Sequence, residues 1–568
     1  MKKPLLSELT LRQKIGQMLM SNQRDINRRL GDEWMTVRTE EEKKVIYEYE
    51  KWGTLRASPG GENRGMNDRL ELNPNGGRQV FHEDSHEFGP WMKKQTELYE
   101  HIPYLISIDA ERDGAGTHFD DLTKTCPPLA IAAANSEELT YKLGAAVGRE
   151  LHCIGVNWRW APVVDIANRY ASSVMRNYSL NDVDTIVKYA SATIRGTQSE
   201  GVATAAKHFP GGDRYSIRDT HFCPSVNSTK MDEWWDVQGK IWKGVIDAGV
   251  YSIMTSHTSW PACDDEKING QYVPVTLSKK AVTDVLKGEL GFKGVVLTDA
   301  LEMNALIALA PYDELIVRMV NAGHDALLST RLKTGDIIEA AVKDGRIPES
   351  RIDDACQRIL DMKEKLGMFD CEYEYVSCVS DDVSPECREI NKEIARRAVT
   401  LVRDRKNLLP VDKNKIKKVS IICSTHEEAF YDYQIPMLEK AFKDRGIEVY
   451  SQRRLDSDEE IRNIARDSDL IIYAAYVADH APYGGMNLYG DECKTYFHAF
   501  TSGKEKSIGV SFGWPYIHYD IMEQCDTFVN AYGKSRELIE AFVESIFGEI
   551  EFKGKSPLKL EPDENHEW

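Results

Sequence analysis

The chain has 568 residues, of which 42% are hydrophobic and 29% are charged, and 72 Lys and Arg against 91 Asp and Glu give a formal net charge of −19 at pH 7. This negative charge repels nucleic acid phosphates and anionic lipid headgroups, so we expect a small or neutral ligand and neither a nucleic acid nor a membrane partner. Every apolar run stops well short of the ~20 residues of a membrane-spanning helix. At this length two large domains are expected.

The first residues and the cysteines both favour a cytoplasmic protein. The start, MKKPLLSELTLRQKIGQ, has only Pro4, Leu5 and Leu6 before polar residues, which is too short for the apolar core of a secretory signal. The 11 cysteines form no C-x-x-C pair, and several lie in apolar runs, such as Cys153 in LHCIGV and Cys423 in SIICST. We expect them to be reduced residues of the core.

Up to residue 370, short apolar runs alternate with helical patterns, which is typical of parallel βα units. The seven runs are GTLRAS at 53, YLISID at 104, GVNWRWAPVVDI at 155, ATAAKHF at 203, VYSIMTSHT at 250, GVVLTDA at 294 and HDALLST at 324. A (β/α)8 barrel needs eight strands, so one strand is irregular or lies within the polar insertion between residues 59 and 100. We predict an α/β catalytic domain over 1–370 with a TIM-like barrel, regular or irregular, rather than an open sheet.

A second α/β unit follows a break in this pattern. Periodicity lapses over the predicted linker, residues 371–388, and an amphipathic helix, REINKEIARRAVTLVRD, comes after it. Five further apolar runs are KVSIICS, GIEVYS, DLIIYAAYV, KSIGVSFGW and DTFVNAYG. They predict a smaller α/β sandwich domain over 389–568.

Polar residues close the predicted barrel strands at their C-terminal ends, where barrel enzymes place their catalytic groups. They are Asp109, Asp165, Lys207, His208, His257 and Asp299. Asp299 follows the buried-strand run VVL, and from this segment alone it could face a substrate or cap the next helix.

A polar loop after KHFPGG presents Asp219 and His221, two residues apart. A carboxylate beside an imidazole favours the charged ring and fixes its tautomer, so His221 could give and take a proton near neutral pH. A lone D-x-H pattern is more typical of a solvated loop histidine, but its position after KHFPGG favours the acid/base interpretation.

The motifs also occur in a familiar order. IGQM, SIDAE, GVNWRWAPVVDI, KHFPGG followed by D-T-H, IMTSHT, PVTLS and GVVLTDALEM resemble those of glycoside hydrolase family 3 over about residues 10–330. The closest branch looks like the bacterial β-N-acetylhexosaminidases. The second unit resembles that family's α/β sandwich, with AVTLVRDRKNLLPV at its entry and FKGKSPLKL at its exit.

The resemblance implies a retaining β-glycosidase that hydrolyses β-linked N-acetylglucosaminides or related β-hexosides through a covalent glycosyl-enzyme. It makes Asp299 the nucleophile, His221 the acid/base and Asp219 the residue that orients and tunes the imidazole. These roles agree with those suggested by the residues themselves. No metal and no cofactor is expected, and the only partner predicted is a small carbohydrate.

The resemblance also implies a set of residues that bind sugar hydroxyl groups in the first subsite. They are Asp109, Arg176, Lys207 and His208, with His257 as a weaker candidate. The alternative for Lys207 and His208 is a salt-bridge network at the barrel mouth, and for Arg176 it is a pairing with Asp165.

Other functions remain open at this point. KHFPGGD stands where relatives read KHFPGHG, and SIDAERDGAG departs from DQEGG, so a β-glucoside is also a candidate substrate. A neutral imidazole base does not repel an anionic acceptor, so inorganic phosphate could replace water and make the enzyme a phosphorylase. Two rivals of other classes are a metal-dependent barrel hydrolase, with ligands His208, His221, His257 and Asp299, and a sugar-binding protein without catalysis.

Overall fold

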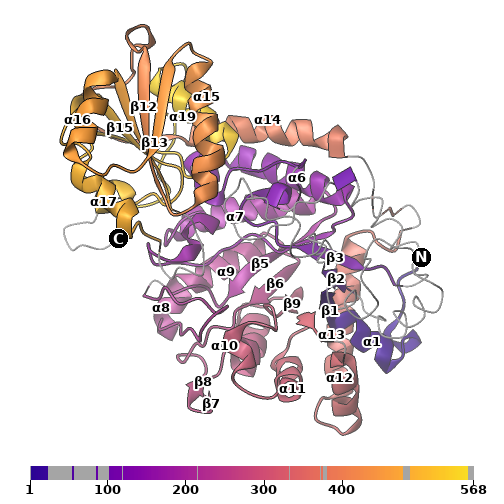
Figure 1. Ribbon diagram of the computed structural model, residues 1–568. Helices are drawn as coiled ribbons and strands as arrows, with labels where there is room; N and C mark the ends of the chain where they lie inside the picture. The colour runs from indigo at the N-terminus through magenta and orange to yellow at the C-terminus, as the bar shows by residue number, and fades with distance from the viewer. Residues whose placement is uncertain are drawn as a thin grey trace, which may run out of the picture.

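The computed structural model describes residues 2–22, 54–56, 85–86, 102–117, 119, 121–213, 215–331, 333–370, 373–374, 376, 380–477 and 486–560. These residues form two α/β units that lie against each other, joined by the long helix α14 (Figure 1). Most of the polar insertion between residues 59 and 100, which was one of two alternative places for the eighth strand, lies outside the described residues.

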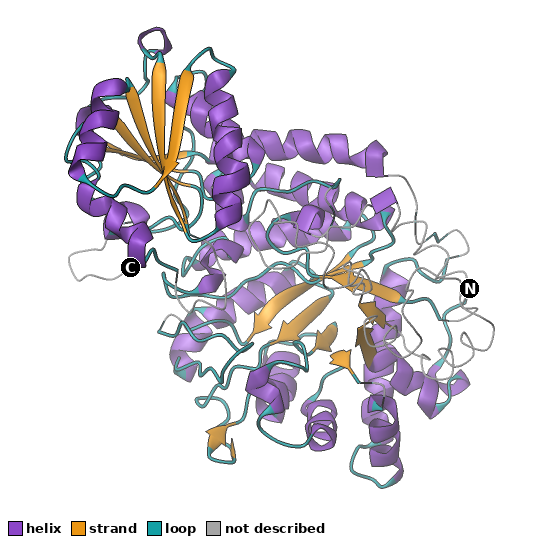
Figure 2. Cartoon of the chain, in the orientation of Figure 1, coloured by secondary structure: helices purple, strands orange, loops and turns teal. Residues whose placement is uncertain are grey.

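The first unit contains a sheet of eight parallel strands that curls into a barrel (Figure 2). In spatial order the strands are β10 (Leu327–Thr330), β1 (Leu19–Asn22), β2 (Thr54–Arg56), β3 (Leu105–Ile108), β4 (Trp158–Arg159), β5 (Ala203–Phe209), β6 (Ser252–Thr255) and β9 (Val295–Leu297). A bridge between Leu297 and Ala326 joins β9 to the start of β10 and closes the barrel. The predicted barrel is therefore confirmed.

The strand missing from the sequence prediction is β1, which precedes the 59–100 insertion. It follows helix α1 (Leu11–Met18) with no turn between them, so its apolar residues look like a continuation of the helix. The helix itself begins at a capping box, in which the side chain of Thr10 accepts the N–H of Gln13 and the side chain of Gln13 accepts the N–H of Thr10. With β1 the sheet has its eight strands without any strand from the insertion.

Helices surround the barrel and are fixed by capping residues and close contacts. Ser136 and Asp182 cap α6 (Glu137–Cys153) and α7 (Val183–Gln198), each accepting a backbone N–H with its side chain. Gly196 lets these two helices touch, because a Cβ there would lie 2.2 Å from the oxygen of Tyr141. The other helices of this unit are α5 (Pro128–Ala133), α8 (Met231–Asp236), α9 (Gln238–Asp247), the π-helix η5 (Lys280–Glu289), α10 (Asn304–Ile307), α11 (Tyr312–Ala322), α12 (Thr334–Lys343) and α13 (Glu349–Lys365).

The second unit has a six-stranded sheet covered by helices. Its strand order is β11 (Thr400–Asp404), β16 (Thr527–Asn530), β15 (Ser507–Ser511), β14 (Leu470–Tyr476), β12 (Lys418–Thr425) and β13 (Glu448–Arg453). Its helices are α15 (Ile435–Lys443), α16 (Asp458–Asp467), α17 (Gly490–His498), α18 (Ile517–Asp520) and α19 (Arg536–Ile546). The predicted α/β sandwich is confirmed, and the five predicted runs are strands β12 to β16.

The edge strand β11 is a correction to the sequence analysis. The segment TLVRD looked like the end of an amphipathic helix, but α14 (Ser380–Ala398) stops at Ala398 and β11 pairs antiparallel with β16. Three β-branched or aliphatic residues can fit either a helix stripe or a strand, and the open edge of β16 decides between them. Helix α14 also covers positions 380–388 of the predicted linker, and the boundaries of the two domains stay a prediction.

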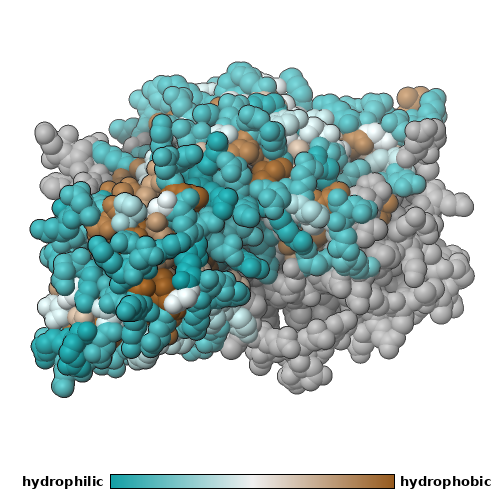
Figure 3. All heavy atoms as spheres, turned by 90° about the horizontal axis from the view of Figure 1, so that it is seen from above, coloured by the Kyte–Doolittle hydropathy of each residue, from teal (hydrophilic) through white to brown (hydrophobic). Residues whose placement is uncertain are grey.

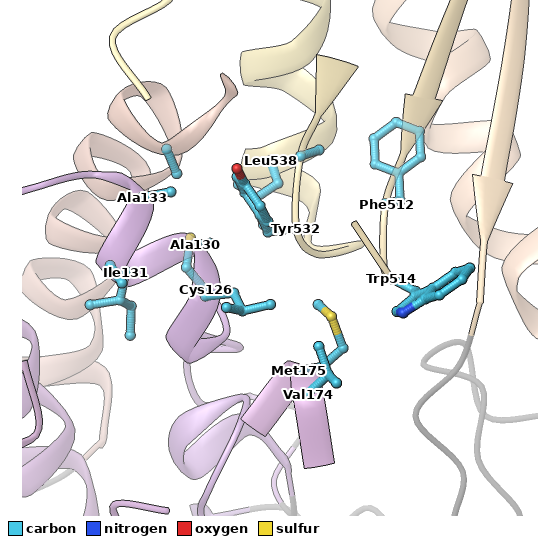
Figure 4. Close-up of a cluster of buried hydrophobic side chains, with 14 of the residues drawn as sticks. Cys126, Ala130, Ile131, Ala133, Val174, Met175, Phe512, Trp514, Tyr532 and Leu538 are labelled. Atoms are coloured by element: carbon cyan, nitrogen blue, oxygen red, sulfur yellow. The ribbon is translucent and has the colours of Figure 1, made fainter. Parts of the chain in front are cut away.

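The two units share an apolar core (Figure 4). Val174 and Met175 of the first unit and Trp514 of the second lie in one cluster of buried side chains. The other labelled members are Cys126, Ala130, Ile131 and Ala133 from the first unit and Phe512, Tyr532 and Leu538 from the second. The interface therefore buries hydrophobic side chains from both units rather than only surface polar groups.

The surface agrees with the high charge of the chain. On the face seen from above, hydrophilic side chains predominate and hydrophobic ones appear in small groups (Figure 3). Within the described residues, no helix combines the length and the apolar character that a bilayer crossing requires.

One expectation about the cysteines is wrong: Cys153 is disulfide-bonded, whereas eight other described cysteines are free. A lasting disulfide is unusual in the reducing cytoplasm, so the cysteines do not indicate that location.

Candidate active site

Asp299 lies just beyond the carboxyl end of β9. The strand itself is fully buried, and the backbone N–H of Asp299 donates to the oxygen of Thr255 at 3.1 Å, which holds the turn against β6. The Oδ1 of Asp299 accepts the N–H of Ala300 at 2.7 Å. Helix α10 begins later, with Met303 as its N-cap, so Asp299 does not cap it. The carboxylate is therefore placed at the carboxyl edge of the barrel.

Asp219 and His221 form a hydrogen-bonded pair on the loop after β5. The Nδ1 of His221 lies 2.7 Å from Oδ1 of Asp219, and the backbone N–H of His221 donates to the same oxygen at 2.9 Å. This hydrogen bond raises the pKa of His221, although partial burial opposes the change. Burial acts to raise the pKa of Asp219, but the hydrogen bonds from His221 outweigh it and lower that pKa. The imidazole side chain is 55% exposed and can meet a ligand.

The loop that carries His221 is docked on the segment that follows Asp299. The N–H of Asn304 donates to the oxygen of His221 at 3.3 Å, and the N–H of Ala305 donates to the oxygen of Thr220 at 3.2 Å. The negative charge of Asp299 contributes to the raised pKa of His221. Residues 78 positions apart in the sequence therefore act on one another at the same edge of the barrel.

A second cluster joins the ends of β3 and β5. Lys207 donates to Asp109 at 2.9 Å and also forms an ion pair with Glu111, whose other oxygen lies 3.4 Å from a guanidinium nitrogen of Arg176. Burial opposes charge on Glu111, but Lys207 and Arg176 lower its pKa to about 2. Burial also opposes charge on Lys207, but Asp109 and Glu111 together raise its pKa. Both groups are therefore charged at neutral pH.

The partner of Arg176 differs from the alternative considered for it. Asp165 binds His208 instead: its Oδ2 lies 2.8 Å from Nδ1 of His208, and its Oδ1 accepts the backbone N–H of His208 at 3.0 Å. Glu111 stands beside Arg176, where the alternative interpretation had placed Asp165. Glu111 was not among the predicted site residues, although SIDAE places it two residues after Asp109 and near the same strand end.

His257 lies behind Asp299. It is 1% exposed, with Nδ1 at 2.7 Å from Oγ1 of Thr276 and Nε2 at 2.9 Å from the oxygen of Ala300. Because it is buried, its pKa is lowered, and the neutral ring can donate from Nε2 to that oxygen. A contact between His257 and the substrate stays a prediction. The hydrogen bond to Ala300 favours a role for His257 in holding the turn at Asp299–Ala300.

The histidines of the metal-dependent alternative are used in other contacts. Nδ1 of His208 and of His221 lie beside carboxylates, and both ring nitrogens of His257 have partners. Among the residues that the structure describes, no three His, Cys, Asp or Glu side chains are grouped in a way that could hold a metal ion. The arrangement instead combines a carboxylate, an acid/base imidazole and a cluster of charged hydrogen-bonding groups, which suits the cleavage of a bond in a polyhydroxylated ligand.

Comparison with protein families and curated proteins bears on this arrangement. Residues 10–362 match the model of the glycosyl hydrolase family 3 N terminal domain. A β-N-acetylglucosaminidase/β-glucosidase of Cellulomonas fimi is 26% identical over 491 residues, which are 80% of this chain and 84% of that protein. β-Hexosaminidase A of Pseudoalteromonas piscicida is 26% identical over 355 residues, 58% of each chain.

Solved structures are similar over nearly the whole chain. A β-glucoside phosphorylase, BglX, bound to 2FGlc has a TM-score of 0.81 at 25% identity and covers 98% of this chain and 95% of its own. A family 3 β-N-acetylglucosaminidase from Paenibacillus sp. str. FPU-7 has a TM-score of 0.77 at 25% identity, with 97% and 99% covered. The similarity includes both α/β units.

Proposed function

We propose that this chain, which belongs to glycosyl hydrolase family 3 and is a glycosidase, works by retention with Asp299 as nucleophile and His221 as acid/base. One observation carries the proposal: the loop bearing His221 is hydrogen-bonded to the segment that follows Asp299 at the carboxyl edge of the barrel. Catalytic groups of barrel enzymes come from the ends of different strands at this edge.

In the first step, an oxygen of Asp299 attacks the anomeric carbon and the bond to the aglycone oxygen breaks. That oxygen takes a proton from Nε2 of His221, because Nδ1 is occupied by Asp219. The sugar is then covalently bound to Asp299, and the imidazole is neutral.

In the second step, the neutral imidazole removes a proton from a water molecule, whose oxygen attacks the anomeric carbon. The bond to Asp299 breaks, and the configuration is the same as in the substrate because the carbon has been inverted twice. Asp219 stabilises the imidazolium before the first step and after the second, since its pKa is lowered and it stays ionised.

Sugar hydroxyl groups are assigned to the charged cluster at the ends of β3 and β5. Lys207 and Arg176 supply donors, and Asp109 supplies acceptor oxygens. Glu111 holds the two cations in place, and His208, fixed by Asp165, adds a further ring nitrogen. Groups held this way need little rearrangement when a sugar binds.

For the substrate, we favour a β-linked N-acetylhexosaminide, with β-glucosides second. The Cellulomonas fimi protein is named for both activities, and the Paenibacillus structure is that of a β-N-acetylglucosaminidase. The identities of 25–26% leave the choice between these sugars to experiment.

Phosphorolysis is the second candidate reaction. It is supported by the imidazole base, which carries no negative charge that would repel phosphate in the second step, and by Arg176, whose positive charge acts on both His221 and Asp219. The similar structure described as a β-glucoside phosphorylase favours the same test.

The test is turnover of 4-nitrophenyl β-D-glucoside and 4-nitrophenyl N-acetyl-β-D-glucosaminide, with and without inorganic phosphate. Release of free sugar from the glucosaminide, independent of phosphate, supports the favoured function. A sugar 1-phosphate among the products indicates phosphorolysis. A wild-type protein that cleaves neither aryl glycoside, under both conditions, would contradict the proposed function.

A further inference from the structure

The second unit contacts the segment between two residues of the candidate active site. We propose that Asp520 and Trp514 of the second unit are positioning residues for the first sugar subsite, because they brace residues 165–176, called here the bracing segment. This inference rests on the proposed function, since it concerns the affinity of that subsite for sugar.

The two ends of the bracing segment lie at the active site. At one end, Asp165 binds both the ring and the backbone N–H of His208. At the other end, Arg176 reaches Glu111, and its charge acts on His221 and Asp219. A shift of the segment would therefore move a ring partner and a guanidinium at the same time.

The middle of the bracing segment is bound to the second unit by hydrogen bonds. A guanidinium nitrogen of Arg169 lies 2.8 Å from Oδ1 of Asp520, and the hydroxyl of Tyr170 donates to the other oxygen of Asp520 at 3.1 Å. The indole N–H of Trp514 donates to the oxygen of Arg169 at 2.7 Å, and the N–H of Met486 donates to the oxygen of Tyr170 at 2.7 Å. The Arg169 and Asp520 side chains are mostly buried, so this pair is screened less than a surface pair.

Apolar contacts act in the same place. The rings of Tyr170 and Trp514 lie 5.6 Å apart, and the guanidinium of Arg169 lies 4.5 Å from the centre of the Tyr170 ring. Val174 and Met175, directly before Arg176, are buried in the cluster that contains Trp514 (Figure 4). Docking of the second unit therefore orders both the polar and the apolar parts of the segment.

The first unit supplies part of the bonding of this stretch, because the N–H of Val164 donates to the oxygen of Lys207 and the N–H of Ala167 donates to the oxygen of Leu180. Residues 164–170 lie in no helix or strand, so they have no regular ladder of backbone hydrogen bonds. The oxygens of Arg169 and Tyr170 accept their hydrogen bonds from donors of the second unit. The conformation of Arg169 and Tyr170, between Asp165 and Arg176, therefore depends in part on contacts with the second unit.

Asp520→Ala, which removes both bonds to the segment, tests the inference in the full chain. We expect KM for the aryl glycoside that the wild type cleaves to rise about tenfold, with a smaller change in kcat, because sugar binding is weakened more than the chemistry. Asp520→Asn keeps an oxygen acceptor and should recover part of the loss. Amide hydrogen exchange of residues 165–176 should be faster in Asp520→Ala than in the wild type.

The matched control is Glu544→Gln. Glu544 of α19 binds Arg396 of α14 at 2.6 and 2.9 Å, and α14 packs on α6 of the first unit, so this pair also ties the units together. The Glu544 side chain binds Arg396 and not the bracing segment, so the KM and the hydrogen exchange of Glu544→Gln should match the wild type.

An Asp520→Ala protein with wild-type exchange over 165–176, or with faster exchange but an unchanged KM, would overturn the inference. An equal rise of KM in Glu544→Gln would do the same, because loosening of the units in general would then explain it. Failure of the proposed function looks different, since the wild-type protein itself would cleave no aryl glycoside.

Discussion

Asp219 holds His221 through two hydrogen bonds to one oxygen atom, 2.7 Å from Nδ1 and 2.9 Å from the backbone nitrogen. The same carboxylate oxygen thus fixes both the ring and the backbone of the histidine. Nε2 is the nitrogen left to exchange a proton with a ligand. The hydrogen bond with Asp219 raises the pKa of the imidazole.

Replacing Asp219 by Asn should shift the alkaline limb of the kcat/KM profile to lower pH. His221 has to be protonated to act as acid, and loss of the carboxylate charge lowers its raised pKa toward the ordinary value, so the acid form disappears at a lower pH. The control is Asp213→Asn in the same loop, because Asp213 binds Tyr215 and Ser228 but not His221. An unshifted limb in Asp219→Asn would contradict the tuning role.

Replacing Asp299 by Asn should lower kcat by about 10³-fold or more while the protein stays folded. The amide is a poor nucleophile, but it keeps an oxygen that can accept the N–H of Ala300. Turnover of the aryl glycosides and the thermal midpoint should be measured together. Near-normal turnover with an unchanged midpoint would exclude Asp299 as nucleophile.

How much of the fold could be predicted depends on local signals. Buried strands flanked by turns, such as Val295–Leu297, stand out in the sequence, and their order predicts a barrel. Strands β1 and β11 were not predicted, because each follows an amphipathic helix without an intervening turn. Pairing with β10 and with β16, respectively, makes these segments strands. Strand identity at such places is decided by the sheet and not by the segment.

For the candidate site, position in the sequence indicated which residues are present but not how they pair. Asp299 and the Asp219–His221 motif follow strand ends, so their location could be predicted. The pairing of Arg176 with Glu111 depends on how the loops after neighbouring strands meet, which spacing along the chain does not show. The contact between Asp520 and Tyr170 joins positions about 350 apart, so spacing along the chain could not predict it either.

Replacing Glu111 by Gln should raise KM about tenfold and lower the thermal midpoint. The change removes one of two carboxylates beside the buried cation of Lys207 and the carboxylate partner of Arg176, so both donors lose their fixed positions. Glu111 has a pKa of about 2 and is ionised throughout the neutral range, so Glu111→Gln should raise KM by the same factor at every pH in that range. A KM equal to that of the wild type would show that Glu111 does not organise the sugar-binding cluster.

Replacing Phe222 by Ala should weaken binding of aryl aglycones. The ring is 53% exposed and its centre lies 6.3 Å from that of His221, the acid that we propose to protonate the oxygen bearing the aglycone. KM for the aryl glycoside should rise, whereas KM for the corresponding glycosyl fluoride, whose leaving group is a single atom, should not. Phe497→Ala, at an exposed ring of α17 in the second unit, is the control. Equal effects on both substrates would place Phe222 away from the leaving group.

Lys363 gives a prediction about stability that is independent of catalysis. It lies fully buried on α13, donates to Oε1 of Gln17 on α1 at 2.6 Å, and has its pKa lowered by burial to about 7 from an ordinary value near 10.5. Between these two values the unfolded chain binds the proton more tightly than the folded one, so the folded state gains stability as the pH rises from 7 toward 10. Below pH 7 the penalty of the buried charge is fully present.

Lys363→Met removes that penalty, so the variant should melt above the wild type at pH 6 by more than at pH 9. Lys14→Met is the opposite case, because Lys14 on the same pair of helices binds Asp353 and has a raised pKa, and its loss should lower the thermal midpoint at both pH values. Thermal midpoints of the three proteins at pH 6 and pH 9 measure this difference. If the gap between Lys363→Met and the wild type were the same at both pH values, Lys363 would have to keep its proton in the folded state over that range, and burial would not be lowering its pKa.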